Sequence, residues 1–350
     1  MRLERRDSRP ATLMVVAPIL AVLVALALSG VLIALAGAPV LEAYARIVQG
    51  AFGSRLALTE TLTRTTPLIL TGLAVAVAFR AKVWNIGAEG QLYVGALTAA
   101  FLGSQLGLVG LPGIALIPAV MIAGALAGMV LLLVPLALRL RFGVDEVVTT
   151  LLLNFVVLLF VSMMIEGPMK DPLAFGWPQS VPVVAEAQLP KLLERSRLHV
   201  GLLIAVVVAI VVYVVQSRTA YGLESRAAGL NPAAARFAGV PLGRTLVKVA
   251  CWSGGLAGLA GAIEVIGVKG YVTTDLSPGY GYAGIIVAML ANLQPLAVVA
   301  AALFAAMMFV GSDSMSRALG VPSFIADVTV ALSLLTMLVA LLFTAYRIRR

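Results

Sequence analysis

Residues 114–137 read IALIPAVMIAGALAGMVLLLVPLA, a stretch without a single charged side chain. A bilayer core about 30 Å thick is crossed by roughly 20 apolar residues in an α-helix. The stretch is long enough to make that crossing, and it predicts a transmembrane helix.

The composition extends this prediction to the whole chain. Hydrophobic residues make up 61% of the 350 residues and charged residues 12%, whereas soluble domains have roughly 45–50% and about 25%. No water-soluble fold of this length buries so much apolar surface. We predict one all-α, polytopic membrane domain over 1–350, with about ten transmembrane helices at 13–36, 65–79, 89–106, 114–137, 147–165, 200–215, 249–268, 282–291, 295–311 and 322–346.

Basic side chains predict the orientation, because loops that stay in the cytoplasm carry an excess of Lys and Arg. With a cytoplasmic tail at 1–12, the inside segments hold 16 of the 25 basic residues: Arg2, Arg5, Arg6, Arg9, Arg80, Lys82, Arg139, Arg141, Arg218, Arg226, Arg236, Arg244, Lys248, Arg347, Arg349 and Arg350. The outside segments hold the rest together with eight acidic residues. Both termini are therefore predicted inside and the connection 166–199 outside. The first run exceeds the apolar core of a secretory signal, so we expect it to be retained.

Composition alone argues against several classes of chemistry in this chain. Cys251 is the one cysteine, which excludes an intrachain disulfide, and His199 is the one histidine. We interpret His199, beside an apolar run, as an interfacial residue. The basic residues are spread between apolar runs, so the net charge of +9 does not indicate nucleic acid. We predict no catalytic residue and no metal site.

Two runs, 65–79 and 282–291, look too short to cross as straight helices. Each adjoins a glycine-rich polar stretch, 85–91 in one half and 278–282 in the other. Short segments interrupted by Gly or Pro in both halves indicate broken helices at a transport pathway, where freed backbone groups face protein or water. Ordinary loops that dip toward the headgroups are the alternative.

Small residues recur at helical spacing in three pairs: Gly124 with Gly128, Gly254 with Gly258, and Ala257 with Gly261. Such pairs let helix backbones approach closely in lipid. They predict a packed bundle and say nothing about transport.

Polar side chains at membrane depth are the candidate pathway residues. A carboxylate there costs at least about 2.5–3.5 kcal/mol on insertion scales, so it usually faces a pathway, a partner or a wet cavity. The candidates are Asn85, Glu89, Gln91, Asn154, Glu264 and Asp327. Asn85 and Glu89 share a face if the helix has begun by residue 85. The alternative is that these groups only bond neighbouring helices.

The longest inside segment, 216–248, holds a candidate docking helix. Asn231 followed by Pro232 is a good N-cap and first-turn pair, the next residues are alanines, and Gly239 is a plausible terminator. A short helix on the basic side is what a membrane subunit needs to bear on a cytoplasmic motor. The chain has no Gly-x-x-x-x-Gly-Lys-Ser/Thr loop, so if ATP drives it, a separate subunit binds the ATP and Mg²⁺.

Four stretches resemble the permeases of bacterial ABC importers related to the branched-chain amino acid and simple-sugar systems, and within them the purine-nucleoside (guanosine-type) branch. They are 82–91, which contains Trp84, then 226–239, 279–290 and 321–327. One departure is Ala291-Asn292-Leu293-Gln294-Pro295, where relatives often read Gly-Arg-Asn-Asn-Pro, so the details of that loop differ.

The resemblance implies a permease of the bacterial inner membrane that carries a nucleoside by alternating access. It implies three partners: a second homologous permease, a cytoplasmic ABC ATPase, and an extracytoplasmic solute-binding lipoprotein. Trp84 joins the expected pathway residues. The coupling helix that docks on the ATPase would contain Arg226, Gly229, Asn231, Pro232, Ala234, Arg236 and Gly239.

Other functions stay open at this point. The same permease type could carry a simple sugar or another small solute. An ion-coupled secondary transporter would titrate Glu89, Glu264 and Asp327, but such carriers usually show a denser relay of membrane carboxylates or histidines. A channel or a membrane scaffold is the third possibility.

Overall fold

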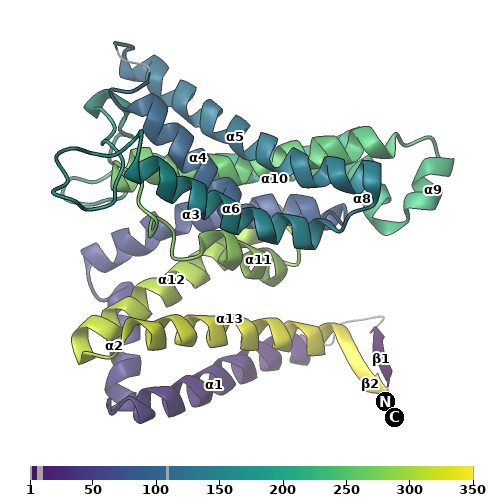
Figure 1. Ribbon diagram of the computed structural model, residues 1–350. Coiled ribbons are helices and arrows are strands. Elements are labelled where there is room, and N and C mark those ends of the chain that lie inside the picture. Colours follow the sequence, from purple (N-terminus) through teal and green to yellow (C-terminus); the bar gives the residue numbers. More distant parts are fainter. Residues whose placement is uncertain (1, 6–10, 108–109, 350) are drawn as a thin grey trace. The chain divides into compact units, whose positions relative to one another are not determined.

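The computed structural model describes residues 2–5, 11–107 and 110–349. Its helices confirm the predicted all-α polytopic class (Figure 1). Two short strands, β1 (Arg2–Arg5) and β2 (Tyr346–Arg349), pair antiparallel and bring the two ends of the chain together. Of the predicted tail 1–12, residues 1 and 6–10 lie outside the described residues.

The helices follow in this order: α1 (Ala11–Leu35), α2 (Val40–Phe52), α3 (Arg55–Arg80), α4 (Ala88–Gly103), α5 (Gly113–Phe142), α6 (Glu146–Glu166), the 3₁₀ turn η1 (Ala185–Ala187), α7 (Gly201–Arg218), α8 (Ala220–Leu230), α9 (Pro232–Phe237), α10 (Leu242–Glu264), the π-helical turn η2 (Val265–Lys269), α11 (Tyr280–Leu290), α12 (Pro295–Leu319) and α13 (Ser323–Ala345). They form two compact units. The first unit contains Met1–Thr61 and Leu303–Arg350, and the second contains Leu62–Ala302.

The predicted count of about ten crossings is not confirmed. Within the described residues, six helices are long and apolar enough to cross a membrane: α3, α5, α6, α7, α10 with η2, and α12. The pair formed by Leu23–Leu35 and Val40–Phe52, bent by 116°, gives up to a seventh. The runs 89–106 and 282–291 became α4, with 16 residues, and α11, with 11. At 1.5 Å per residue, both helices fall short of about 30 Å.

One of the two predicted short segments is wrong. The run 65–79 lies inside α3, a continuous helix of 26 residues. The apolar run stops at polar residues near Arg64, but the helix continues, because threonines satisfy their hydroxyls within it. Thr59 donates to the carbonyl oxygen of Leu56 at 2.9 Å, and Thr71 donates to that of Pro67 at 2.9 Å. The break lies after α3, at 81–87, and precedes the short helix α4.

Helices α4, α5 and α10 form the centre of the second unit, and glycines let their backbones touch. A Cβ atom built on Gly128 would lie 2.2 Å from the carbonyl oxygen of Gly254, and one on Gly258 would lie 2.3 Å from that of Gly124. One on Gly261 would lie 1.9 Å from the carbonyl oxygen of Leu92. The predicted packing role of the small-residue pairs is confirmed.

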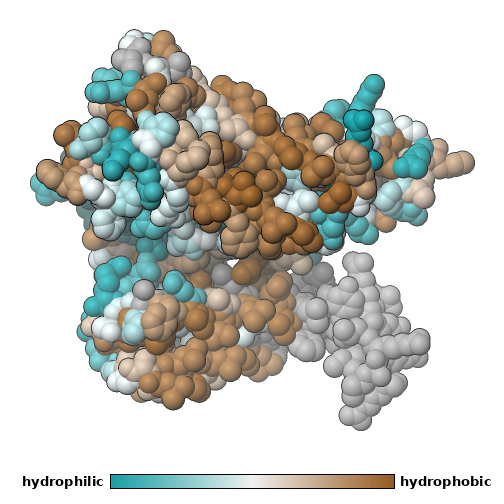
Figure 2. All heavy atoms as spheres, in the orientation of Figure 1, coloured by the Kyte–Doolittle hydropathy of each residue, from teal (hydrophilic) through white to brown (hydrophobic). Residues whose placement is uncertain are grey.

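The outer face of the second unit is apolar along its middle. Figure 2 shows a hydrophobic band over α5 and α6 with hydrophilic residues toward both ends of these helices. Exposed side chains on this face include Ile122, Leu126, Val130, Leu152, Phe155 and Leu159. A band of this kind is what lipid tails would cover.

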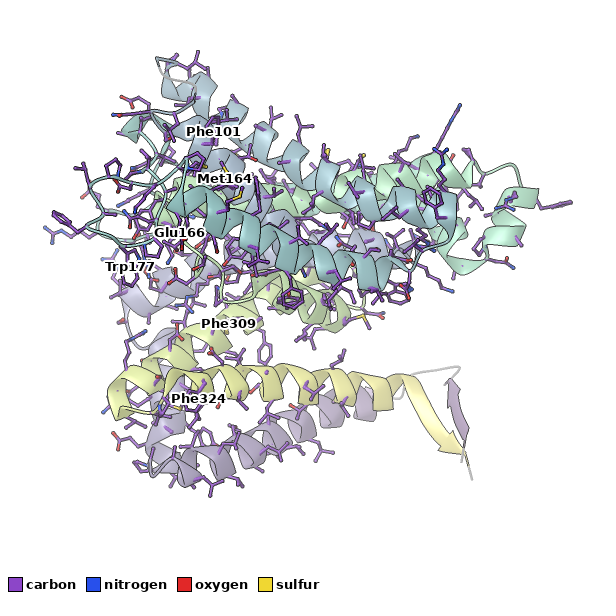
Figure 3. All side chains as sticks on the ribbon, viewed as in Figure 1. Phe101, Met164, Glu166, Trp177, Phe309 and Phe324 are labelled. Atoms are coloured by element: carbon purple, nitrogen blue, oxygen red, sulfur yellow. The ribbon has the colours of Figure 1, made fainter. Side chains whose placement is uncertain are left out.

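The connection between α6 and α7 contains a hairpin that is held together by hydrogen bonds. The amide of Val181 donates to the carbonyl oxygen of Met169 at 2.9 Å, and the Gln179 side chain donates to the Asp171 carboxylate at 2.9 Å. Trp177 projects from it at the end of the unit where Glu166 closes α6 (Figure 3). Helix α9 lies at the opposite end of the same unit (Figure 1). The two connections are thus separated as the predicted topology requires, and which side is cytoplasmic stays a prediction.

In the first unit, α1 packs along α13. Ile33, Ala43 and Met315 form its small core. A Cβ atom on Gly50 would lie 2.2 Å from the Cβ of Ser314, so α2 touches α12 at this glycine.

Candidate functional site

The break between α3 and α4 exposes backbone polar groups that a continuous helix would satisfy. Helix α3 ends with the amide of Val83 donating to the carbonyl oxygen of Ala78 at 3.0 Å, and Lys82 takes a positive φ of 53°. Residues 83–86 have no helical structure, and α4 begins at Ala88. The backbone of this segment needs partners from elsewhere in the fold.

Two buried amide side chains close the inner side of the break. Asn85 Nδ2 donates to Gln91 Oε1 at 2.9 Å and to Ser253 Oγ at 2.9 Å, while Gln91 Nε2 donates to Asn85 Oδ1 at 2.8 Å. Asn85 Oδ1 also accepts from the amide of Gly87, and the Ser253 hydroxyl donates to the carbonyl oxygen of Ala74. Asn85 therefore lies before the helix and pairs with Gln91, so the suggested helical face shared with Glu89 does not form.

Helix α6 supports the break from the other side. Glu146 Oε1 accepts from the amide of Trp84 at 3.3 Å and from Arg139 Nη1 at 2.6 Å. One turn later, Thr150 Oγ1 accepts from the amide of Ile86 at 3.3 Å. The sequence reasoning missed Glu146 and Thr150. Their four-residue spacing with Asn154 was the signal that they share one face of a helix.

Asn154 completes this row. Its Oδ1 accepts from the amide of Gly90 at 2.8 Å, and its Nδ2 donates to the carbonyl oxygen of Ile86 at 3.0 Å and to the Tyr282 hydroxyl at 3.1 Å. Asn154 thus joins the break to the first turn of α11. The short helices α4 and α11 meet at this point.

Glu89 also joins α4 to α11. Its Oε2 accepts from the amide of Gly281 at 2.6 Å, and its side chain is 3% exposed. The hydroxyl proton of Thr71 on α3 is shared between the carbonyl oxygens of Pro67, at 2.9 Å, and Tyr280, at 3.0 Å. The start of α11 is therefore bonded to α3, α4 and α6.

The remaining predicted pathway residues differ in exposure. Trp84 is 44% exposed, and its ring meets that of Phe79 edge to face, with centroids 4.8 Å apart. Glu264 is buried at the end of α10. Asp327, on α13, is exposed and belongs to the first unit.

His199 is buried within the protein just before the start of α7, and its position at the membrane interface stays a prediction. Its Nδ1 accepts from the amide of Gly201 at 3.1 Å, and Cβ atoms on Gly201 or Gly267 would strike its ring. Burial lowers the pKa of His199 to about 4. Among the described residues, no group of three or more histidine, cysteine or acidic side chains could hold a metal ion.

The predicted docking segment forms two helices, α8 and α9. Asn231 Oδ1 accepts from the amides of Ala233 and Ala234, Pro232 is the first residue of α9, and Gly239 follows with a φ of 84°. The predicted local start and end are confirmed, and α8 was not foreseen. Arg226, Ala234 and Arg236 are exposed, as is Phe237, at 96%.

Gly229 seats α8 on the end of α3. A Cβ atom there would lie 2.2 Å from the carbonyl oxygen of Arg80. Arg80 in turn donates to Gln216 Oε1 at 2.6 Å. The segment that ends in α9 therefore rests directly beside the break.

Comparisons with known proteins place the chain in a family. The family model described as "Branched-chain amino acid transport system / permease component" matches residues 57–341. A glucose ABC transporter permease protein of Haloferax volcanii is 35% identical over 99% of this chain and 93% of the relative.

Two further relatives have names that refer to nucleosides. A guanosine ABC transporter permease protein of Bacillus subtilis is 32% identical over 91% of both chains. A nucleoside ABC transporter permease protein of Lactococcus lactis subsp. cremoris is 30% identical over 91% of this chain and 88% of the relative. No solved structure matches the chain. The chain therefore belongs to the family of branched-chain amino acid transport system permease components.

Proposed function

We propose that this chain is the membrane-spanning permease subunit of an ATP-driven importer and forms the translocation pathway for a nucleoside. The observation that carries this proposal is its similarity to the guanosine permease of Bacillus subtilis, which extends over 91% of both chains. We infer a bacterial inner membrane location with both termini cytoplasmic. Transport would proceed by alternating access.

The pathway is proposed to run beside the break and the start of α11. Two aromatic rings there keep exposed area, 44% for Trp84 and 40% for Tyr282. Aromatic rings stack on nucleobases, because every base has a π face, at about 1–3 kcal/mol per base. Asn85, Glu89, Gln91 and Asn154 would hold the wall behind these rings, and Glu264 and Asp327 are further proposed pathway residues.

ATP and Mg²⁺ would bind to a cytoplasmic ATPase that docks on α8 and α9. The exposed side chains of Leu230 and Phe237 support this, because large apolar groups without cover commonly mark a protein interface. Arg226, Gly229, Asn231, Pro232, Ala234, Arg236 and Gly239 form the proposed coupling segment. A second homologous permease and an extracytoplasmic solute-binding lipoprotein would complete the importer.

A simple sugar is the second candidate solute, because the Haloferax volcanii relative is named a glucose permease. The two solute classes share a hydroxylated sugar ring, and only the nucleoside adds an aromatic base. A stacking pathway would therefore favour the nucleoside.

The test is uptake by the complete importer in proteoliposomes, with its cognate ATPase, partner permease and binding protein. We expect uptake of labelled guanosine that requires ATP and is competed by other nucleosides, with no competition by glucose or leucine. Uptake of glucose without uptake of guanosine would identify a sugar as the transported solute. Uptake driven by an ion gradient without ATP would identify a secondary transporter.

A further inference from the structure

The first turn of α11 is capped by two side chains from different parts of the chain. Amides at a helix start lack partners within the helix. Ser277 Oγ accepts from the amides of Gly279 at 3.1 Å and Tyr280 at 2.8 Å. Glu89 Oε2 accepts from the next amide, that of Gly281, at 2.6 Å.

Tyr93 fixes the loop before α11 from the same face of α4 as Glu89, because the two residues are four apart. Its hydroxyl donates to the carbonyl oxygen of Thr274 at 2.7 Å and accepts from the amide of Ser277 at 3.2 Å. One face of α4 therefore holds both the loop and the first turn of α11.

The two helices also touch through their backbones. A Cβ atom on Gly281 would lie 2.2 Å from the amide nitrogen of Glu89 and 2.5 Å from its Cα. Any side chain at residue 281 is excluded, so the first turns of α4 and α11 lie in direct contact.

This arrangement explains why a carboxylate stands here. Glu89 lies in the first turn of α4 and bonds to the first turn of α11. Helix N-termini carry partial positive charge and stabilise a nearby anion. The Glu89 carboxyl group thus lies at the positive ends of two helices, and with 3% exposure its surroundings are protein groups.

We propose that Glu89 is a positioning residue that locks α11 to α4 and does not contact the solute. The inference rests on the proposed function for its meaning in transport, since the locked helices would border the pathway. Glu89, Ser277 and Tyr93 then act as one unit, and removing any member releases the start of α11.

Amide hydrogen exchange of the full-length chain in nanodiscs tests the lock without any solute. Glu89→Ala is expected to raise exchange at 274–283 about tenfold or more, because the buried amide of Gly281 loses its hydrogen-bond acceptor. Glu89→Gln keeps the shape and is the second variant if the alanine variant folds poorly.

Ser277→Ala should raise exchange at the same residues, and the double variant of Glu89→Ala with Ser277→Ala should raise it little further. Glu186→Gln, at an exposed acid, is the control and should leave exchange unchanged.

A transport measurement separates positioning from general damage. In the complete importer, Glu89→Gln is expected to lower the number of solute molecules moved per ATP hydrolysed. A loss of folded protein alone would lower the rate of solute transport and the rate of ATP hydrolysis by the same factor. Unchanged exchange at 274–283 in Glu89→Ala, or additive effects with Ser277→Ala, would overturn the lock. If the importer carries no nucleoside, the proposed function is wrong. The exchange measurement still shows whether Glu89 holds the start of α11 on α4.

Discussion

Asn85 and Gln91 exchange two hydrogen bonds across the break before α4, with N···O distances of 2.9 and 2.8 Å. Each side chain offers the other one donor and one acceptor, and both are shielded from solvent. A buried polar group that loses its partner costs about 1–3 kcal/mol, whereas removal of both partners costs less than the sum. The pair should therefore behave as one energetic unit.

We predict that Asn85→Ala and Gln91→Ala each lower the free energy of unfolding by about 1–3 kcal/mol. The double variant should lose clearly less than the sum of the two single variants, because neither side chain is then left without its partner. Thermal unfolding of the unmodified chain, the two single variants and the double variant in one detergent measures this double-mutant cycle. Additive losses would mean that the two amides do not act as a pair.

Close packing of α10 on α5 gives a second prediction with a control on the same helix. Gly258→Ala would bring a methyl group 2.3 Å from the carbonyl oxygen of Gly124, whereas a Cβ on Gly243 meets nothing within 4 Å. Gly258→Ala should destabilise the chain by about 1–3 kcal/mol or more, since overpacking forces the backbone apart. Gly243→Ala should be neutral or stabilising by up to about 1 kcal/mol.

Yield of folded protein and midpoint of thermal unfolding measure both glycine variants. Equal behaviour of the two would contradict the close approach of these helices. The comparison is strict, because the mutation is the same and only the surroundings differ.

The pKa of His199 gives a pH-dependent prediction. The folded value of about 4 lies below the ordinary 6.5, so between these pH values the unfolded chain binds a proton that the folded chain excludes. Above about pH 6.5 His199 is neutral in both states and does not make the free energy of unfolding depend on pH. As the pH decreases from 6.5 toward 4, the free energy of unfolding falls by up to about 3 kcal/mol. In His199→Gln this part of the pH dependence should vanish. Parallel unfolding curves for the two proteins over pH 4–7 would contradict it.

Local signals in the sequence predicted local structure well. The runs 147–165 and 200–215 became α6 and α7, because no charged residue interrupts them. Asn231, Pro232 and Gly239 marked the start and end of α9, since capping depends on neighbouring residues only. The search for continuous apolar runs did not predict helix α2, because the apolar residues of an amphipathic helix are interrupted by polar ones.

The contacts of the candidate site required the fold. Asn154 was found as a polar residue in an apolar run, but its partner Tyr282 lies 128 positions away. Glu146 and Thr150 were overlooked, although the backbone of the break depends on them. Sequence separation hides such pairs, because no local pattern specifies which helices become neighbours.

The predicted orientation can be tested by labelling. Single cysteines replace Arg5, Gln188, Asn231 and Arg349 in a Cys251→Ala background, and an impermeant thiol reagent is added to intact cells from outside. Only the cysteine at position 188 is expected to react, because that connection is predicted outside. Labelling at position 231 would reverse the orientation of the second unit.

The last prediction concerns the docking surface on α9. Ala234 is exposed in this chain, so Ala234→Asp should leave folding and membrane insertion intact. If the cognate ATPase covers this surface, the new carboxylate becomes an unpaired buried charge, at a cost of about 3 kcal/mol or more, which weakens assembly about a hundredfold. Ala185→Asp makes the same change at an exposed alanine in the connection between α6 and α7, away from α9, and serves as the control. The ATPase should co-purify with the control and be lost from Ala234→Asp, together with solute-stimulated ATP hydrolysis. Phe237→Ser should weaken retention as well, because it removes the most exposed apolar side chain of the segment. Normal co-purification and normal transport in both α9 variants would reduce this segment to a plain connection between α8 and α10.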